Sequence, residues 1–476
     1  MCLAPRGGIL SGMEITTGLF DHMVVQRTSK GTSDARFVGR CSCDGEVVAT
    51  VKKCGRTLKG FSSIPAGAVK EGVLSGQLKG VPEGGPYDVI LRCSCGCHLT
   101  VRDILVGDVW ILAGQSNMQG IGFQAEAEKP HRLVRAFYCD DRWAVAKDPI
   151  HNLWEAVDAV HHDLWKQRTG GGQRQKDTVF GAGPGVSFGR AMHKVTGVPQ
   201  GLIPCAHGGT SMDQWSPDLK EKGGSSLYGA MIRRFQKAGG SVAGVFWYQG
   251  ESDSAAESAL RYTEKMSRFV SCLRQDTGHP DLPIVIVQIA RVFFDVCVAG
   301  WNSVQEQQRL LPAVIPHLAT VPAIDLPMND LIHISAGGHK RLGRRAAQAM
   351  CVLRYGRRSG LPPIELETVA IRPNKLLGTA DIEVSFRNVS GSLRSNGPAW
   401  GFALVREGKQ YDRIFRVDIQ GNTAVCRTSC SADDLASYCL HYGYGLAPVC
   451  TITDEDDRSL PVFGPLPLSQ EERRCV

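Results

Sequence analysis

Apolar and polar positions alternate differently in three successive stretches of the chain. In the first, residues 14–103, short apolar runs are separated by clusters of Gly, Pro, Ser and Asp, and no long helical period occurs. Such runs are typical of β-strands joined by turns. The pattern predicts a β-sandwich-like N-terminal domain. Its expected strands cover residues 35–39, 46–51, 72–78 and 87–93.

The second stretch, residues 104–358, alternates apolar runs with segments whose apolar residues recur every three or four positions. This alternation predicts an α/β fold, a doubly wound parallel sheet with helices on both faces. The expected strands are 108–113, 200–205, 244–248, 284–289 and 319–324, and the expected helices are 186–195, 226–237, 255–273, 302–311 and 336–354. Because the N-terminal domain runs directly into the first of these strands, we expect no flexible linker between them.

Two parts of the chain depart from this alternation. Residues 130–181, rich in His, Trp, Arg and Gly, are interpreted as an insertion over the binding crevice. Residues 359–476 return to short alternating runs and predict a C-terminal β-rich region without evident chemistry. The expected strands there are 364–371, 380–386, 399–405 and 422–426.

Composition narrows the classes of function. The 476 residues are 43% hydrophobic and 21% charged, and the net charge of +7 is scattered, so we expect no nucleic-acid partner. No run approaches the roughly 20 apolar residues that span a bilayer, and the first twenty residues lack a secretory apolar core. A cytoplasmic location and no membrane association are therefore expected, although a different N-terminus would leave secretion open. The sequence does not indicate an oligomeric state.

The chain has seventeen cysteines, for which we favour a reduced, packed state. Cys93, Cys95 and Cys97 would share one face if a strand continued that far, and Cys41 and Cys43 have the same one-residue gap. Their one-residue gaps differ from the two-to-four-residue gaps of structural zinc sites. We therefore interpret them as packing residues and expect no metal.

Polar clusters follow the central strands. The first strand ends in Gly114-Gln115-Ser116-Asn117, and ligands of parallel sheets bind outside the carboxyl ends of the strands, so Ser116 is predicted to face a crevice. A plain turn or helix N-cap is the alternative. Asp330 and His333, three positions apart after the last strand, can place a carboxylate against one imidazole nitrogen while the other faces Ser116.

A second serine competes with Ser116. Gly185-Val-Ser187-Phe-Gly189 fits the nucleophile-elbow pattern of α/β-hydrolases, but that motif requires a strand immediately before the serine. Phe180-Gly-Ala-Gly-Pro184 stands there instead. We therefore place Ser187 in the first turn of a helix that packs near the site.

These residues also resemble a known family. The blocks Gly114-Gln-Ser-Asn-Met118, Gly208-Gly-Thr-Ser211, Trp247-Tyr-Gln-Gly-Glu-Ser-Asp253 and Asp330-Leu-Ile-His333 are similar to those of the sialate O-acetylesterase-type SGNH hydrolases, and the resemblance covers about residues 18–356. It implies a serine esterase without cofactor that hydrolyses O-acetyl groups of a small-molecule or oligosaccharide acetyl-sugar, with O-acetylated sialic acid favoured. Acetylxylan or another acetylated carbohydrate is the alternative substrate. A catalytically inactive carbohydrate-binding protein is the alternative of another class.

The resemblance also implies roles for individual residues. Ser116 would be the nucleophile, His333 the base and Asp330 the group that orients it. The N–H groups of Ser116 and Gly209 and the side chain of Gln249 would form the oxyanion hole. Candidates for orienting the base or binding substrate are Glu251, Gln115 and Asn117. Whether Asp330 or Glu251 orients His333 is open at this point, and His207 departs from the apolar residue or tryptophan expected there.

Overall fold

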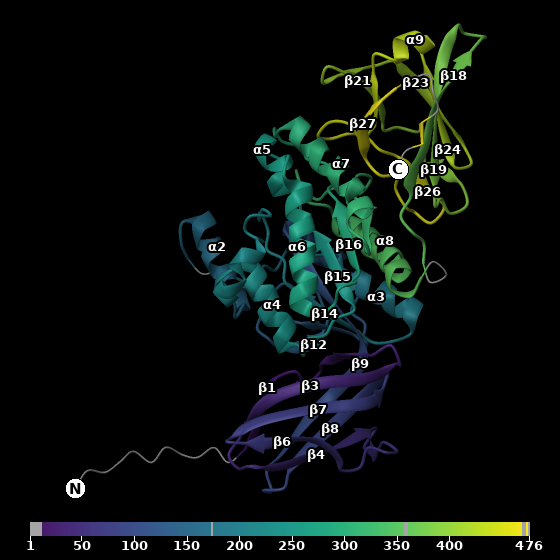
Figure 1. Cartoon of the computed structure of the whole chain (residues 1–476). Coiled ribbons are helices and arrows are strands. Elements are labelled where there is room, and N and C mark those ends of the chain that lie inside the picture. Colours follow the sequence, from purple (N-terminus) through teal and green to yellow (C-terminus); the bar gives the residue numbers. More distant parts are fainter. Residues whose placement is uncertain (1–11, 173–174, 357–359, 469–472, 475–476) are drawn as a thin grey trace.

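Three bodies follow one another along the long axis of the molecule (Figure 1). The structure, a computed structural model, describes residues 12–172, 175–356, 360–468 and 473–474. A β domain occupies the N-terminal end, an α/β body the middle, and a second β region the C-terminal end. None of the described helices is long and apolar enough to cross a membrane.

The N-terminal strands are longer than the sequence predicted, and they contain the predicted runs except for Gly72, which precedes β7. They follow the order β1-β3-β7-β6-β4-β8-β9, with antiparallel neighbours, and β2 pairs with β9 in parallel. Alternate residues of β3, among them Ala35 and Phe37, are buried, as expected for a strand with one face in a core. The bounds are β1 Met13–Thr17, β2 Val24–Gln26, β3 Thr32–Cys41, β4 Gly45–Lys53, β5 Arg56–Thr57, β6 Ile64–Lys70, β7 Val73–Pro82 and β8 Gly84–Cys93.

A single long strand, β9 (His98–Gly114), belongs to both the N-terminal domain and the central sheet. Its first part pairs with β8, and from Asp108 onward it pairs with strands of the central sheet. The buried carboxylate of Asp108 accepts hydrogen bonds from Arg27 at 2.8 and 3.0 Å and from the hydroxyl of Tyr355 at 2.6 Å. The expected absence of a flexible linker is confirmed, and the predicted boundary at 103–104 falls inside a continuous strand.

The central sheet is parallel in the order β11-β14-β9-β15-β16-β17, with β12 added antiparallel at one edge. The strands are β11 Val134–Phe137, β12 Trp143–Val145, β14 Gln200–Pro204, β15 Gly244–Tyr248, β16 Ile284–Gln288 and β17 Leu318–Pro322. The helices are α1 Ser116–Gln119, α2 Ala159–Thr169, α3 Gly185–Thr196, α4 Leu227–Lys237, α5 Ala256–Ala259, α6 Tyr262–Thr277, α7 Val298–Val314 and α8 Ala336–Tyr355. Two short strands, β10 (Gly122–Phe123) and β13 (Phe180–Ala182), form a separate antiparallel pair.

Two details correct the prediction for this body. Residues 130–181 are not wholly an insertion, because β11 is a parallel strand of the sheet and α2 follows it. The helix expected over 255–273 is interrupted at Leu260 and Arg261, which separate α5 from α6.

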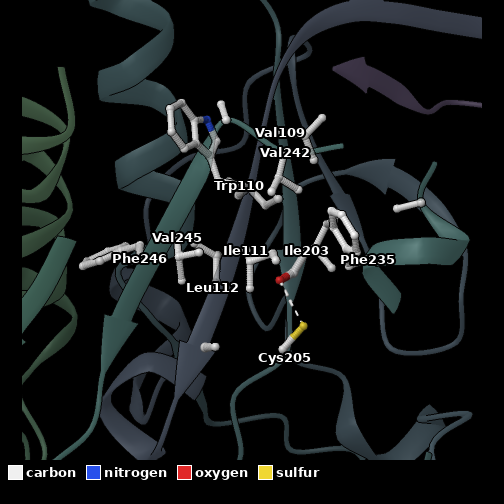
Figure 2. Close-up of a cluster of buried hydrophobic side chains, with 14 of the residues drawn as sticks. Val109, Trp110, Ile111, Leu112, Ile203, Cys205, Phe235, Val242, Val245 and Phe246 are labelled. Carbon is white, nitrogen blue, oxygen red and sulfur yellow. Dashed lines mark hydrogen bonds between the residues drawn. The ribbon is translucent and has the colours of Figure 1, made fainter. Parts of the chain in front are cut away.

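Helices cover both faces of the sheet, and the side chains of β9 show how (Figure 2). Trp110 lies 5.5 Å from Phe188 of α3, measured between ring centroids, on one face. On the other face, Ile111 and Ile203 point toward Phe235 of α4 (Figure 2). A strand covered on both faces is apolar at every position, which explains why the central strands read as continuous apolar runs.

The C-terminal region is a β structure with its own buried core. A five-stranded sheet, β23-β24-β19-β18-β28, is accompanied by a four-stranded sheet, β22-β21-β25-β27, and by the pair β20-β26. The bounds are β18 Glu365–Asn374, β19 Thr379–Arg387, β20 Leu393–Ser395, β21 Phe402–Arg406, β22 Lys409–Tyr411, β23 Ile414–Gln420, β24 Thr423–Thr428, α9 Ala432–Leu435, β25 Cys439–Tyr442, β26 Ile452–Asp454, β27 Phe463–Pro467 and β28 Arg473–Arg474.

Candidate active site

Ser116 lies at the carboxyl end of β9, where the sequence places it. It is the first residue of α1, and its exposed fraction is 8%. Gly114 has a φ of 129°, and a Cβ there would lie 2.0 Å from the carbonyl oxygen of Tyr248. Only glycine therefore allows β9 and β15 to approach so closely where the chain turns to present the serine.

His333 and Asp330 form a direct pair in the loop before α8. The Nδ1 atom of His333 lies 2.7 Å from Oδ2 of Asp330, while Oδ1 accepts the backbone N–H groups of Ile332 at 2.9 Å and His333 at 2.7 Å. Partial burial opposes ionisation of Asp330, but these hydrogen bonds outweigh it and lower its pKa. The carboxylate is thus charged and fixed against one side of the ring.

Asn117 ties the serine loop to the histidine loop. Its Oδ1 accepts the N–H of Ile334 at 3.0 Å, and its Nδ2 donates to the carbonyl of Ile332 at 3.2 Å. Both neighbours of His333 are therefore anchored to the residue that follows Ser116. Among the described residues, no hydrogen bond joins the Ser116 hydroxyl to His333, and such catalytic bonds commonly tighten only when substrate is present.

Glu251 supports Asn117 rather than the imidazole. Its Oε1 accepts a hydrogen bond from Nδ2 of Asn117 at 2.8 Å, and its side chain is buried. Burial raises the pKa of Glu251 above its ordinary value. The sequence left open which acid contacts the imidazole. In the structure Asp330 contacts the ring of His333, and Glu251 contacts Asn117 of the serine loop.

The loop after β14 supplies a second wall beside Ser116. A Cβ on Gly208 would lie 3.1 Å from the Cβ of Ser116, so this glycine allows a close approach. The N–H of Gly208 donates to Oε1 of Gln119 at 2.9 Å. The N–H groups of Ser116 and Gly209 donate no hydrogen bond to any residue that the structure describes, which leaves both available to an oxyanion.

The side-chain amide of Gln249, predicted for the oxyanion hole, forms hydrogen bonds with the protein instead. Its buried amide nitrogen donates to the carbonyl of Thr210 at 3.1 Å and to Oδ2 of Asp253 at 2.6 Å, which uses both of its N–H groups. The amide thus braces the loop that carries Gly209. Gln115 is likewise buried, and its Oε1 accepts the N–H groups that follow Gln249, from Gly250 at 3.4 Å and Ser252 at 3.3 Å.

Two residues of the predicted insertion reach the site without having been singled out. In α2, His161 lies with its Nδ1 atom 2.9 Å from that of His207, and Arg168 donates to the carbonyl of Gly208 at 2.5 Å. The sequence did contain a signal for them, because His161 and Arg168 are seven residues apart and such residues lie on one face of a helix. The unexpected histidine at position 207 thus has a histidine beside it.

The C-terminal region reaches the histidine loop indirectly, through the loop after β16. The backbone N–H of Val292, in the loop after β16, donates to Leu446 at 2.9 Å, and the next residue, Phe293, donates to Leu331 at 2.7 Å. Leu331 lies between Asp330 and His333. The region that the sequence left without a role therefore supports the histidine loop through one intervening segment.

Ser187 occupies the place predicted for it. It lies in the first turn of α3, is buried, and donates to the carbonyls of Pro184 at 3.0 Å and His339 at 3.2 Å. A hydroxyl held in this way joins α3 to α8, and the predicted position of Ser187 in the first turn of a helix is confirmed.

Asn117→Ala is expected to lower kcat by about ten- to a hundredfold. It leaves the buried N–H of Ile334 and the carboxylate of Glu251 without their partner, a loss of about 1–3 kcal/mol in the groups that position His333. Acetate release measured beside that of Asn329→Ala checks this. Asn329 lies in the histidine loop, and its side-chain amide donates a hydrogen bond to the carbonyl of Ile121. Equal losses of kcat in the two variants would contradict a specific role for Asn117.

A serine whose loop is tied to a carboxylate-paired histidine, together with backbone N–H groups that no described residue accepts, is the arrangement of an ester hydrolase. The family model for the carbohydrate esterases described as sialic acid-specific acetylesterases matches residues 106–352. The chain belongs to this family of carboxylic ester hydrolases, and the predicted resemblance is confirmed.

Individual relatives support the assignment to different extents. A probable carbohydrate esterase of Arabidopsis thaliana is 31% identical over 265 residues, which cover 51% of this chain and 89% of that protein. Human sialate O-acetylesterase is 31% identical over 193 residues, 36% of each chain, so the match spans about a third of its length. The structure of a carbohydrate acetylesterase from Xanthomonas citri covers 95% of this chain and 99% of its own, with a TM-score of 0.69 and 21% identity, and this likeness shows a shared fold.

Proposed function

We propose that this chain is a serine esterase of SGNH-hydrolase architecture that removes O-acetyl groups from sugars. The observation that carries the proposal is the pairing of Asp330 with His333 in a loop that Asn117 anchors beside Ser116. A binding module would have no use for a charge-oriented imidazole next to a serine.

The proposed reaction follows the acyl-enzyme scheme. The Oγ atom of Ser116 attacks the acetyl carbonyl carbon, and His333 takes the hydroxyl proton. The N–H groups of Ser116 and Gly209 stabilise the oxyanion, and the tetrahedral intermediate collapses when His333 returns the proton to the departing sugar oxygen. Water, activated by the same imidazole, then hydrolyses the acetyl-serine ester and releases acetate.

Within this class, we propose O-acetylated sialic acid as the substrate. Arg168 supports this choice, because it lies so close to Gly209 that a Cβ there would be 2.3 Å from its guanidinium. Sialic acid carries a carboxylate, the group a guanidinium binds best, whereas acetylated xylan carries none on its xylose backbone. Other acetylated carbohydrates are the second candidate.

The test measures acetate release from O-acetylated sialic acid and from acetylated xylose oligosaccharides, using the wild type and Arg168→Gln. We expect a higher kcat/KM for the sialic acid and a selective loss of that preference, by about tenfold, in the variant. Higher turnover of acetylated xylose would assign the second candidate. Binding without acetate release from any sugar would contradict the esterase itself.

A further inference from the structure

Two turns at one end of the N-terminal domain bring cysteines together. One turn, 42–44, joins β3 to β4, and the other, 94–97, joins β8 to β9. Since Val47 of β4 pairs with Cys93 of β8, the two turns lie side by side. The predicted convergence of these thiols required a strand that continued through Cys97, but β8 ends at Cys93 and a turn places the thiols instead.

Three sulfurs lie close enough to share one ion. The Sγ atoms of Cys41, Cys95 and Cys97 are all within 4.8 Å of one another. Zinc binds thiolate at about 2.3 Å, so the sulfurs of a tetrahedral site lie roughly 3.8 Å apart. A contraction of about 1 Å or less would bring these three sulfurs onto a zinc ion.

Two more thiols border this triad. The side chain of Cys95 also interacts with those of Cys93 and Cys43. The hydroxyl of Ser42 lies 3.7 Å from the sulfurs of Cys43 and Cys97. A fourth thiol therefore lies near enough to complete the four ligands of a structural zinc site.

Packing does not account for this cluster. Cysteines that serve as small apolar residues are buried, yet Cys43 and Cys95 are exposed. The turn that carries Cys95 is held in place by backbone hydrogen bonds, from Cys93 to Cys97 at 2.8 Å, from Gly96 to Cys93 at 2.9 Å and from Ser94 to Glu46 at 2.9 Å. The backbone that carries these thiols is therefore held in place by the neighbouring strands, as a metal site requires.

We propose that Cys41, Cys95 and Cys97 bind a structural zinc ion, with Cys43 or Cys93 as the fourth ligand. The ion would fasten the β3–β4 turn to the β8–β9 turn and so stabilise the N-terminal domain. It takes no part in ester hydrolysis, since β9, whose 17 residues span up to about 50 Å, separates this turn from Ser116.

The binding experiment uses the full chain, reduced with a phosphine and freed of metal, titrated with zinc sulfate in competition with a chromophoric chelator. We expect one zinc ion per chain. Cys95→Ser and Cys97→Ser should each weaken binding at least tenfold, whereas the matched control Cys54→Ser, at an exposed turn of the same domain, should not. Cys43→Ser and Cys93→Ser identify the fourth ligand.

Cobalt substitution and chelation provide independent measurements. A thiolate-to-cobalt charge-transfer band that is lost in Cys95→Ser supports the site. Chelation of the zinc-loaded chain should lower the Tm while acetate release at 25 °C is unchanged. Because Cys95 is exposed, its variant should fold, and circular dichroism checks this.

Two results would overturn the zinc site. One is the absence of stoichiometric zinc in the reduced wild type, and the other is equal affinity in Cys95→Ser and Cys54→Ser. Loss of turnover on chelation, restored by zinc, would instead contradict a purely structural ion.

Discussion

Replacing Ser116 by alanine should lower kcat for acetate release by about a thousandfold or more, with little change in stability. The side chain is the one nucleophile at the carboxyl end of β9, and its removal leaves only the oxyanion donors and substrate binding. Because α1 does not depend on the hydroxyl, the fold should be intact. Steady-state kinetics and thermal unfolding of the same preparation test both parts.

Ser187→Ala is the matched control for this experiment. The hydroxyl of Ser187 makes two hydrogen bonds to backbone carbonyls, so its loss should cost about 1–2 kcal/mol of stability and less than about tenfold in kcat. If Ser187→Ala were inactive and Ser116→Ala active, the nucleophile would have to be reassigned to Ser187 of α3.

The central strands could be predicted closely because local sequence determines them. β15 was predicted at its observed bounds and β14 to within one residue, since each is a short apolar run that ends in polar residues. The placement of Ser116 and of the Asp330 and His333 pair followed from the same rule, that polar residues after parallel strands share one edge of the sheet.

Elements that depend on distant partners could not be predicted in this way. β11 contains Arg135 in the middle of four residues, and this charge is tolerated in a buried strand because it pairs with Asp103 at 2.9 Å. The family resemblance implied an oxyanion role for the amide of Gln249, and its hydrogen bonds to Thr210 and Asp253 become visible only in the folded chain. The cysteine cluster likewise depends on two turns meeting, which no spacing along one strand reveals.

Asp330→Asn should lower kcat by about a thousand- to ten-thousandfold at neutral pH. The carboxylate accepts the Nδ1 proton of His333 and stabilises the imidazolium that forms when Ser116 attacks. An amide carries no charge, and its NH₂ group can select the wrong tautomer. Because the pKa of Asp330 is lowered, the carboxylate is ionised at neutral pH, and the wild-type enzyme keeps its contribution until the pH falls toward that lowered value.

Rates measured across the pH range separate this role from that of Glu251. In Asp330→Asn the maximum rate should fall, because the imidazolium that forms during attack has lost its charged partner. Glu251→Gln should lower kcat by less than about tenfold, because the amide oxygen can still accept the hydrogen bond from Asn117. Burial already disfavours the charge that this substitution removes, which is why it raises the pKa of Glu251. If Glu251→Gln lost most of its kcat while Asp330→Asn kept nearly all of it, Glu251 would be the orienting acid. Asp330 would then only support the backbone of the histidine loop.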